Sequence, residues 1–182
     1  MCADICGTKE SGTIPFSIPY WRTNTQNSHS RVKGSDTFFP RIDEHPDIEE
    51  ALFVQLKAVN MNCNTIIHGD YNLGNVLVGP TQYTIIDWTN VQLGDRRYDF
   101  SWASFLIRIY NEEVVYQQFI RTYLLEIPTS GDDMARFESI ACLRWLLLNR
   151  IANVPKNVDT DSRIHDFLLQ DSLIPKRLSL FI

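Results

Sequence analysis

The feature that most constrains this chain is the stretch from Thr65 to Asp99, TIIHGDYNLGNVLVGPTQYTIIDWTNVQLGDRRYD. Short apolar runs alternate here with polar residues. Three of these polar residues, Asp70, Asn75 and Asp87, each lie beside such a run. Short apolar runs bounded by turn residues are typical of buried strands. The pattern therefore predicts polar side chains presented at the ends of short buried strands.

The secondary structure expected around this stretch is a hairpin between helices. Strands are predicted over 65–67, 76–78 and 83–86, and the last two form a hairpin through the turn at 79–82. A helix beginning at Pro46 precedes them and ends near Val59, because its apolar residues recur on one helical face and proline suits a first turn. The helices predicted after the hairpin cover about 99–110 with Asp99 as cap, 112–126, a third beginning after the cap Ser130, and 163–170.

The composition divides the chain into two parts. Residues 1–44 are rich in Ser, Thr, Asn and Gly and are interrupted by prolines, which predicts an irregular N-terminal segment. Residues 45–182 carry the strand and helix patterns and predict one α+β unit that is mostly α-helical. A chain of 182 residues suits one compact domain of ordinary size.

Charge and hydropathy exclude several classes of protein. The net charge of −5 and the lack of a dense basic patch argue against a nucleic-acid partner. The sequence contains no run of about 18 apolar residues, so no membrane span is predicted. The N-terminus has no apolar core of the signal-peptide type. The four cysteines suit free thiols in a reducing compartment, so a cytoplasmic location is expected.

The spacing of Asp70 and Asn75 indicates a particular chemistry. His68, Asp70 and Asn75 match the H-x-D-x4-N catalytic loop of kinases. In such a loop one carboxylate faces the acceptor hydroxyl, and one amide oxygen binds Mg²⁺ nearby. A second carboxylate must complete the metal site, and Asp87 follows the third strand directly. Mg²⁺ prefers oxygen ligands, so Asn and Asp are suitable types.

These residues and the segment that follows them resemble a known family. The matching segments are His68-Gly69-Asp70 with Asn75, Ile86-Asp87-Trp88, and Gly94-Asp95 with Asp99. Together they resemble the aminoglycoside phosphotransferase and choline kinase family, whose members are small-molecule kinases with a protein-kinase-like fold. One departure is Arg96, which stands where many members have proline.

The resemblance implies a fold and roles for named residues. Residues 45–182 would form the C-terminal lobe of a protein-kinase-like fold, with a small β-hairpin carrying the catalytic loop. Asp70 would be the catalytic base, and Asn75 and Asp87 would hold Mg²⁺. His68 and Asp99 would support the loop. No residue that contacts the nucleotide can be named from the sequence.

The function implied is an ATP-dependent phosphotransferase that moves the γ-phosphoryl group to a hydroxyl of a small molecule, with Mg²⁺ as cofactor. The family's N-terminal lobe carries a nucleotide-covering loop and a strand lysine, and residues 1–44 show neither. Three alternatives stay open: a truncated kinase, a kinase that works with a separately encoded N-lobe, or a non-catalytic C-lobe remnant that acts as a binding or regulatory module. Apolar surface where that lobe would dock also predicts self-association.

Overall fold

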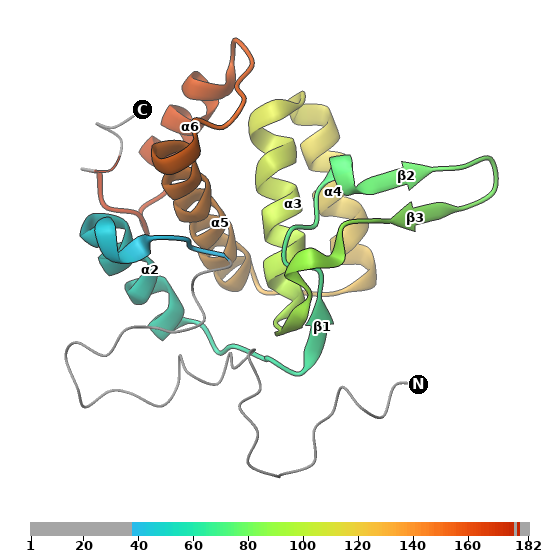
Figure 1. Cartoon of the computed structure of the whole chain (residues 1–182), viewed down its shortest axis with the longest axis horizontal. Coiled ribbons are helices and arrows are strands. Elements are labelled where there is room, and N and C mark those ends of the chain that lie inside the picture. The colour runs from blue at the N-terminus through green and yellow to red at the C-terminus, as the bar shows by residue number, and fades with distance from the viewer. Residues whose placement is uncertain (1–37, 177, 179–182) are drawn as a thin grey trace.

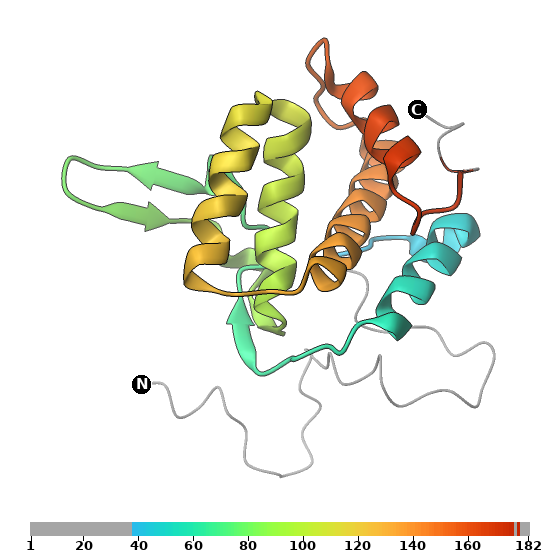
Figure 2. The ribbon, with the colours of Figure 1, turned by 180° about the vertical axis from the view of Figure 1, so that it is seen from behind.

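The core is built by helices, as the computed structural model of residues 38–176 and 178 shows (Figure 1). Helix α3 (Arg96–Tyr110) lies at the centre and contacts α4 (Glu113–Glu126), α5 (Gly131–Ala152) and α6 (Thr160–Gln170). Helix α2 (Pro46–Ala58) packs against α5. Both views place α4 and α5 on different sides of α3 (Figure 2). The prediction of a mostly helical fold is therefore confirmed.

The helices form where the sequence places apolar faces and caps. The large side chains that are fully buried include Phe105, Phe137, Ile140, Leu143, Trp145 and Leu147. Each such burial stabilises the fold by about 1.5–3 kcal/mol relative to exposure. The hydroxyl of Ser130 accepts a hydrogen bond from the backbone N–H of Asp133 at 3.1 Å, which confirms the predicted cap of α5.

The strands form two small antiparallel pairs. Strand β2 (Val76–Val78) pairs with β3 (Tyr83–Ile85), so the predicted hairpin is confirmed. Strand β1 (Thr65–Ile67) pairs with β4 (Gln92–Gly94). The sequence analysis missed β4, because its sequence Gln92-Leu93-Gly94 has a single apolar residue and so lacks the apolar run that marks the other strands. Single turns of 3-10 helix cover Ile42–Glu44 (η1), Leu73–Asn75 (η2) and Trp88–Asn90 (η3).

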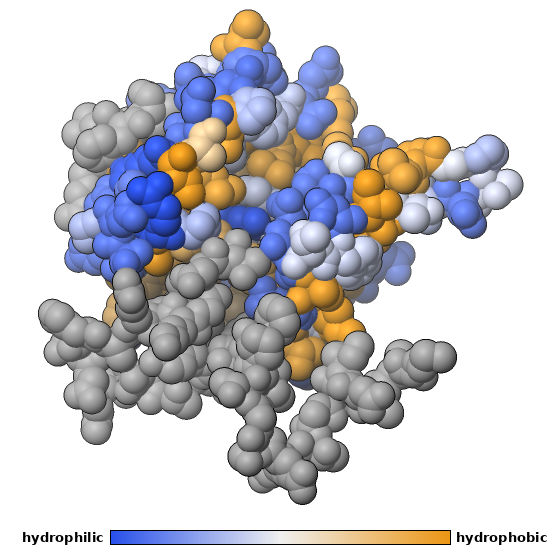
Figure 3. All heavy atoms as spheres, in the orientation of Figure 1, coloured by the Kyte–Doolittle hydropathy of each residue, from blue (hydrophilic) through white to orange (hydrophobic). Residues whose placement is uncertain are grey.

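The prediction that the strands are buried is wrong for the hairpin and for two of the three residues of β1, of which only Ile67 is buried while Ile66 is 54% exposed. The side chains of Leu77, Val78 and Tyr83 are 53, 74 and 76% exposed. The hairpin projects away from the helices, and apolar side chains gather along it (Figure 3). Burial depends on what covers a strand, and no residue that the structure describes covers this one.

The start of α3 also differs from its prediction. The helix begins at Arg96, and its cap is Asp95, whose carboxylate accepts a hydrogen bond from the backbone N–H of Arg97. Asp99 lies in the first turn, so it is not the cap. Arg96 occupies the first helical position, where proline is favoured because the N–H has no intrahelical partner. Helix α6 begins at Thr160 rather than at residue 163.

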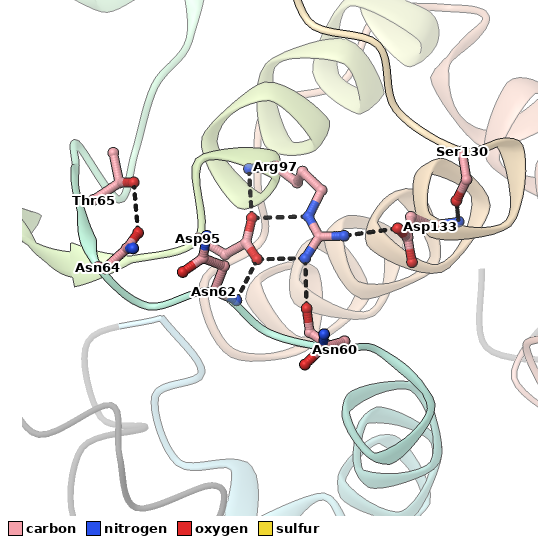
Figure 4. A network of polar contacts seen from close by, with 8 residues as sticks. All are labelled: Asn60, Asn62, Asn64, Thr65, Asp95, Arg97, Ser130 and Asp133. Carbon is pink, nitrogen blue, oxygen red and sulfur yellow. Dashed lines mark hydrogen bonds and ion pairs between the residues drawn. The ribbon is translucent and has the colours of Figure 1, made fainter.

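Arg97, two residues after the cap Asp95, connects three parts of the chain (Figure 4). Its guanidinium donates to the carboxylates of Asp95 and Asp133 and to the backbone carbonyl of Asn60. Burial alone would raise the pKa of Asp95, but hydrogen bonds from Arg97 and from backbone amides hold that pKa below its ordinary value. These contacts fix the start of α3 against α5 and against the segment after α2.

Some predictions fall partly outside the described residues. Of the irregular segment 1–44, the structure describes only 38–44, which form a turn and η1. Cys2 and Cys6 lie outside it, and of the two cysteines that the structure describes, Cys142 is a buried free thiol. Within the described part, no helix has the length and apolar character needed to span a membrane.

Candidate active site

The loop of residues 68–75 leaves β1 through a conformation that requires glycine. Gly69 has φ +81°, in the left-handed region that other residues rarely adopt. A Cβ atom there would lie 2.5 Å from the carbonyl oxygen of Asn90 and 2.6 Å from a ring carbon of Phe38. The neighbouring chain therefore comes so close that only glycine fits at this point.

Replacing Gly69 by alanine is expected to lower the free energy of unfolding by about 1–3 kcal/mol, because the new methyl group meets backbone in a strained conformation. Urea unfolding followed by circular dichroism measures the loss. Gly131→Ala is the matched control, since a Cβ at this first residue of α5 meets nothing within 4 Å. Equal stability of the two variants would contradict the close approach at Gly69.

Asp99 lies beneath the loop and binds its backbone. Its two carboxylate oxygens accept hydrogen bonds from the amides of His68 at 2.6 Å and Gly69 at 2.8 Å. The first turn of a helix favours negative charge, which suits this position on α3. Burial raises the pKa of Asp99 above its ordinary value, and the two amides oppose that rise only in part. One carboxylate thus fixes two successive peptide units of the loop.

His68 ties the loop to the strand that precedes Asp87. Its Nε2 lies 2.8 Å from the carbonyl oxygen of Ile86, and its Nδ1 accepts from the amide of Asp70 at 3.2 Å. A ring that donates at Nε2 and accepts at Nδ1 is the neutral Nε2–H tautomer. The side chain is buried, and its ring packs 4.8 Å from that of Trp88. His68 therefore sets the distance between the loop and the start of η3.

Asn75 and Asp87 lie next to each other at the base of the hairpin. The side-chain amide of Asn75 donates to the carbonyl oxygen of Asp70 at 2.9 Å, which leaves its Oδ1 as the atom available to a ligand. The backbone carbonyl of Asn75 accepts from the amide of Ile86 at 2.9 Å, and Asp87 follows directly. The loop and the hairpin thus bring the backbones of Asn75 and Asp87 close together, although the two residues are distant in sequence.

Asp87 has an unusual backbone conformation for a residue with a side chain. Its φ of 60° and ψ of 57° are left-handed, a strained choice that clusters at functional sites. Of the described residues, only Thr89 donates to its exposed carboxylate, at 2.8 Å. One carboxylate and one amide oxygen fit Mg²⁺, which typically takes one or two carboxylates and completes its shell with water and phosphate oxygens. No cluster of three or more His, Cys, Asp or Glu side chains suited to a metal occurs within the described residues.

The carboxylate of Asp70 is held through one of its two oxygens. The indole Nε1–H of Trp102 donates to Oδ1 at 2.8 Å, and a guanidinium nitrogen of Arg144 lies 3.5 Å from the same atom. No hydrogen bond from the described residues reaches Oδ2. The side chain is 33% exposed, so Oδ2 is the oxygen open to a ligand.

Sequence reasoning missed both Trp102 and Arg144. Arg144 is only 4% exposed, and it donates to the carbonyl oxygen of Gly69 at 2.8 Å and to the hydroxyl of Tyr98 at 3.0 Å. Burial raises the pKa of Tyr98 to about 12, so this partner is a neutral hydroxyl. A lone arginine inside the apolar run IACLRWLLL was the available signal, because a buried cation needs a partner.

One comparison with known proteins gives a match. A family model described as "Phosphotransferase enzyme family" matches residues 9–139, well over half of the chain. The matched range contains the loop, Asp87 and Asp99, and it begins ahead of residue 45. Arg144 lies beyond its end. Neither a curated protein nor a solved structure matches the chain.

Proposed function

The chain belongs to the phosphotransferase enzyme family, and on this premise we propose that it transfers the γ-phosphoryl group of ATP to a hydroxyl of a small molecule in the cytoplasm. The observation that carries the proposal is the set of contacts around Asn75. Its side chain binds the backbone of Asp70, and its backbone pairs with the residue before Asp87. The proposed base and the two proposed metal ligands thus belong to one connected piece of backbone. Residues 45–182 would be the C-terminal lobe of a protein-kinase-like fold.

Asp70 is the proposed base. The acceptor oxygen forms a bond to the γ-phosphorus, and the bond from that phosphorus to the bridging oxygen of ADP breaks with its electron pair. The hydroxyl proton passes to the Asp70 carboxylate. Phosphoryl transfer has a loose transition state, so catalysis consists mainly of positioning and of neutralising charge. The loop supports this role because Asp99 and His68 fix its backbone on both sides.

Asn75 and Asp87 are the proposed metal ligands, through Oδ1 of the amide and through the carboxylate. Mg²⁺, when bound, would neutralise negative charge on the phosphoryl oxygens. Asp87 contributes the charge of this pair, and Thr89 orients its carboxylate through Oδ1. Asn75 is oriented by its contact with the backbone carbonyl of Asp70, so a change at Asn75 should also disturb the backbone that carries Asp70.

A second candidate is a non-catalytic binding or regulatory module. The observation that favours it is the hairpin, where Leu77, Val78 and Tyr83 expose apolar side chains that no described residue covers. Exposed apolar patches mark surfaces that bind partners. The proposed partner is a separate N-terminal lobe or a second copy of the chain.

Calorimetric titration of Mg·ATP into the purified chain separates the two candidates. The enzyme predicts saturable binding that disappears when EDTA removes Mg²⁺, because the proposed site holds the nucleotide through the metal. Titration of ATP in EDTA is the matched control on the same protein. If no binding heat is detected up to millimolar Mg·ATP, the result would favour the binding module, or a kinase that needs its partner lobe to bind the nucleotide.

A further inference from the structure

We propose that Trp102 and Arg144 are the positioning residues of Asp70, which hold Oδ1 of its carboxylate and so reserve Oδ2 for the proton of the acceptor hydroxyl. The proposal rests on the proposed function, because it assigns an orientation to the base of that reaction. It concerns two residues that no loop pattern contains. Trp102 lies 32 residues after Asp70, and Arg144 lies 75 residues after Gly69.

The first argument is that both donors converge on the same oxygen. Trp102 donates to Oδ1 at 2.8 Å, and the guanidinium of Arg144 lies 3.5 Å from it. The guanidinium of Arg144 also lies over the indole ring of Trp102, with its carbon 4.1 Å from the ring centre. Movement of one donor therefore displaces the other. Rotating the carboxylate out of this orientation would break the hydrogen bond from Trp102 and separate the ion pair with Arg144, so the oxygen that accepts no hydrogen bond from the described residues stays on one side.

The second argument is that the buried guanidinium of Arg144 forms its ion pair with Asp70, while its charge also acts on the nearby carboxylate of Asp99. The side chain of Arg144 is 5% exposed, and its one ion pair among the described residues is with Asp70. Its hydrogen-bond partners there, the carbonyl of Gly69 and the hydroxyl of Tyr98, are neutral. Removing one partner of a buried ion pair is costly, because the other charge is left uncompensated. Arg144 therefore couples the core of α5 to the carboxylate and to the loop backbone beside it.

The third argument concerns the chemistry. The acceptor oxygen bonds to the γ-phosphorus, the bond to the bridging oxygen of ADP breaks, and the proton moves to a carboxylate oxygen of Asp70. An oxygen that already accepts from Trp102 and faces Arg144 is a poor proton acceptor. Oδ2 receives no hydrogen bond from the described residues, and the side chain is one-third exposed. The geometry thus selects Oδ2 for this step.

The kinetic test uses Trp102→Phe, which keeps an aromatic ring against Arg144 but removes the N–H donor. With Mg·ATP and water as acceptor, kcat is expected to fall by about 10- to 100-fold, while the Kd for Mg·ATP stays unchanged. Trp145→Phe is the matched control. Trp145 is also fully buried and donates its indole N–H, but to the hydroxyl of Tyr110 rather than to the base. Its kcat should match that of the wild type.

A second readout does not depend on turnover. The indole ¹H–¹⁵N signal of Trp102, assigned by its loss in Trp102→Phe, should move in Asp70→Asn and in Arg144→Met. It should stay in place in Arg150→Met, which removes another arginine–aspartate pair of α5, the one with Asp47. A Trp102 signal that does not respond to Asp70→Asn would overturn the contact and the proposal with it.

The two failures are distinguishable. An active wild type whose kcat survives Trp102→Phe, or falls equally in Trp145→Phe, would overturn the positioning role alone. An inactive wild type that binds no Mg·ATP, but shows the expected indole shifts, would overturn the proposed activity of this chain acting alone, and the positioning role in that activity with it. A fall in kcat restricted to Trp102→Phe, together with the indole shifts, supports the proposal.

Discussion

Asp70→Asn is expected to lower turnover by about 10²–10⁴-fold, the usual contribution of a general base. Asparagine has the same shape, and its amide oxygen can still accept the hydrogen bond from Trp102. It cannot take the proton of the acceptor hydroxyl. The buried charge of Arg144 also loses its ion-pair partner, so a modest loss of stability should accompany the loss of activity.

The measurement is ADP release from Mg·ATP, with water and then a panel of small-molecule alcohols as acceptors. Asp166→Asn is the matched control, because Asp166 is exposed on α6, and the same substitution there should leave turnover unchanged. Thermal melting of both variants separates lost chemistry from lost folding. Near-normal turnover in folded Asp70→Asn would remove Asp70 from the role of base.

Asp87→Ala is expected to abolish Mg²⁺-dependent activity and the binding of Mg·ATP. The substitution removes the one charged ligand of the proposed metal site. It also places alanine in a left-handed conformation, which costs stability in its own right. Asp87→Asn separates the two effects, since asparagine tolerates this conformation and can still accept from Thr89, but lacks the negative charge.

Calorimetry with increasing Mg²⁺ measures this prediction directly. Asp87→Asn should require far more Mg²⁺ than the wild type for the same nucleotide binding, and Asp87→Ala should bind none. Asp43→Asn is a control of the same chemistry, because Asp43 is an exposed acid of η1. Equal Mg²⁺ dependence of the wild type and Asp87→Asn would show that Asp87 is not a metal ligand.

Local patterns in the sequence predicted most of the secondary structure. The hairpin, the proline at the start of α2 and the cap Ser130 each depend on residues that are close in sequence, so they could be read in advance. The start of α3 was misplaced because two aspartates, Asp95 and Asp99, stand near it. Asp95 caps the helix by accepting from the amide of Arg97, whereas the carboxylate of Asp99 accepts from the loop backbone instead.

Contacts between residues that are distant in sequence could not be predicted from such local patterns. Strand β4 was missed because it forms only by pairing with β1. Burial of the strands was predicted wrongly for the hairpin and for Thr65 and Ile66 of β1, because an apolar run shows a preference for burial but not whether another part of the chain packs over it. The match to the family model shows membership, whereas the roles of Asp70, Asn75 and Asp87 stay predictions until the experiments above are done.

The sequence by itself determined which residues can carry chemistry, since the spacing of His68, Asp70 and Asn75 on one short loop is a local property of the chain. Only the tertiary structure decided how Asp70 is oriented. Trp102 and Arg144 reach its carboxylate from α3 and α5, and nothing in the loop specifies them. The physical reason is that a buried charge is stabilised by whichever groups packing brings within a few ångströms, however distant they are along the chain.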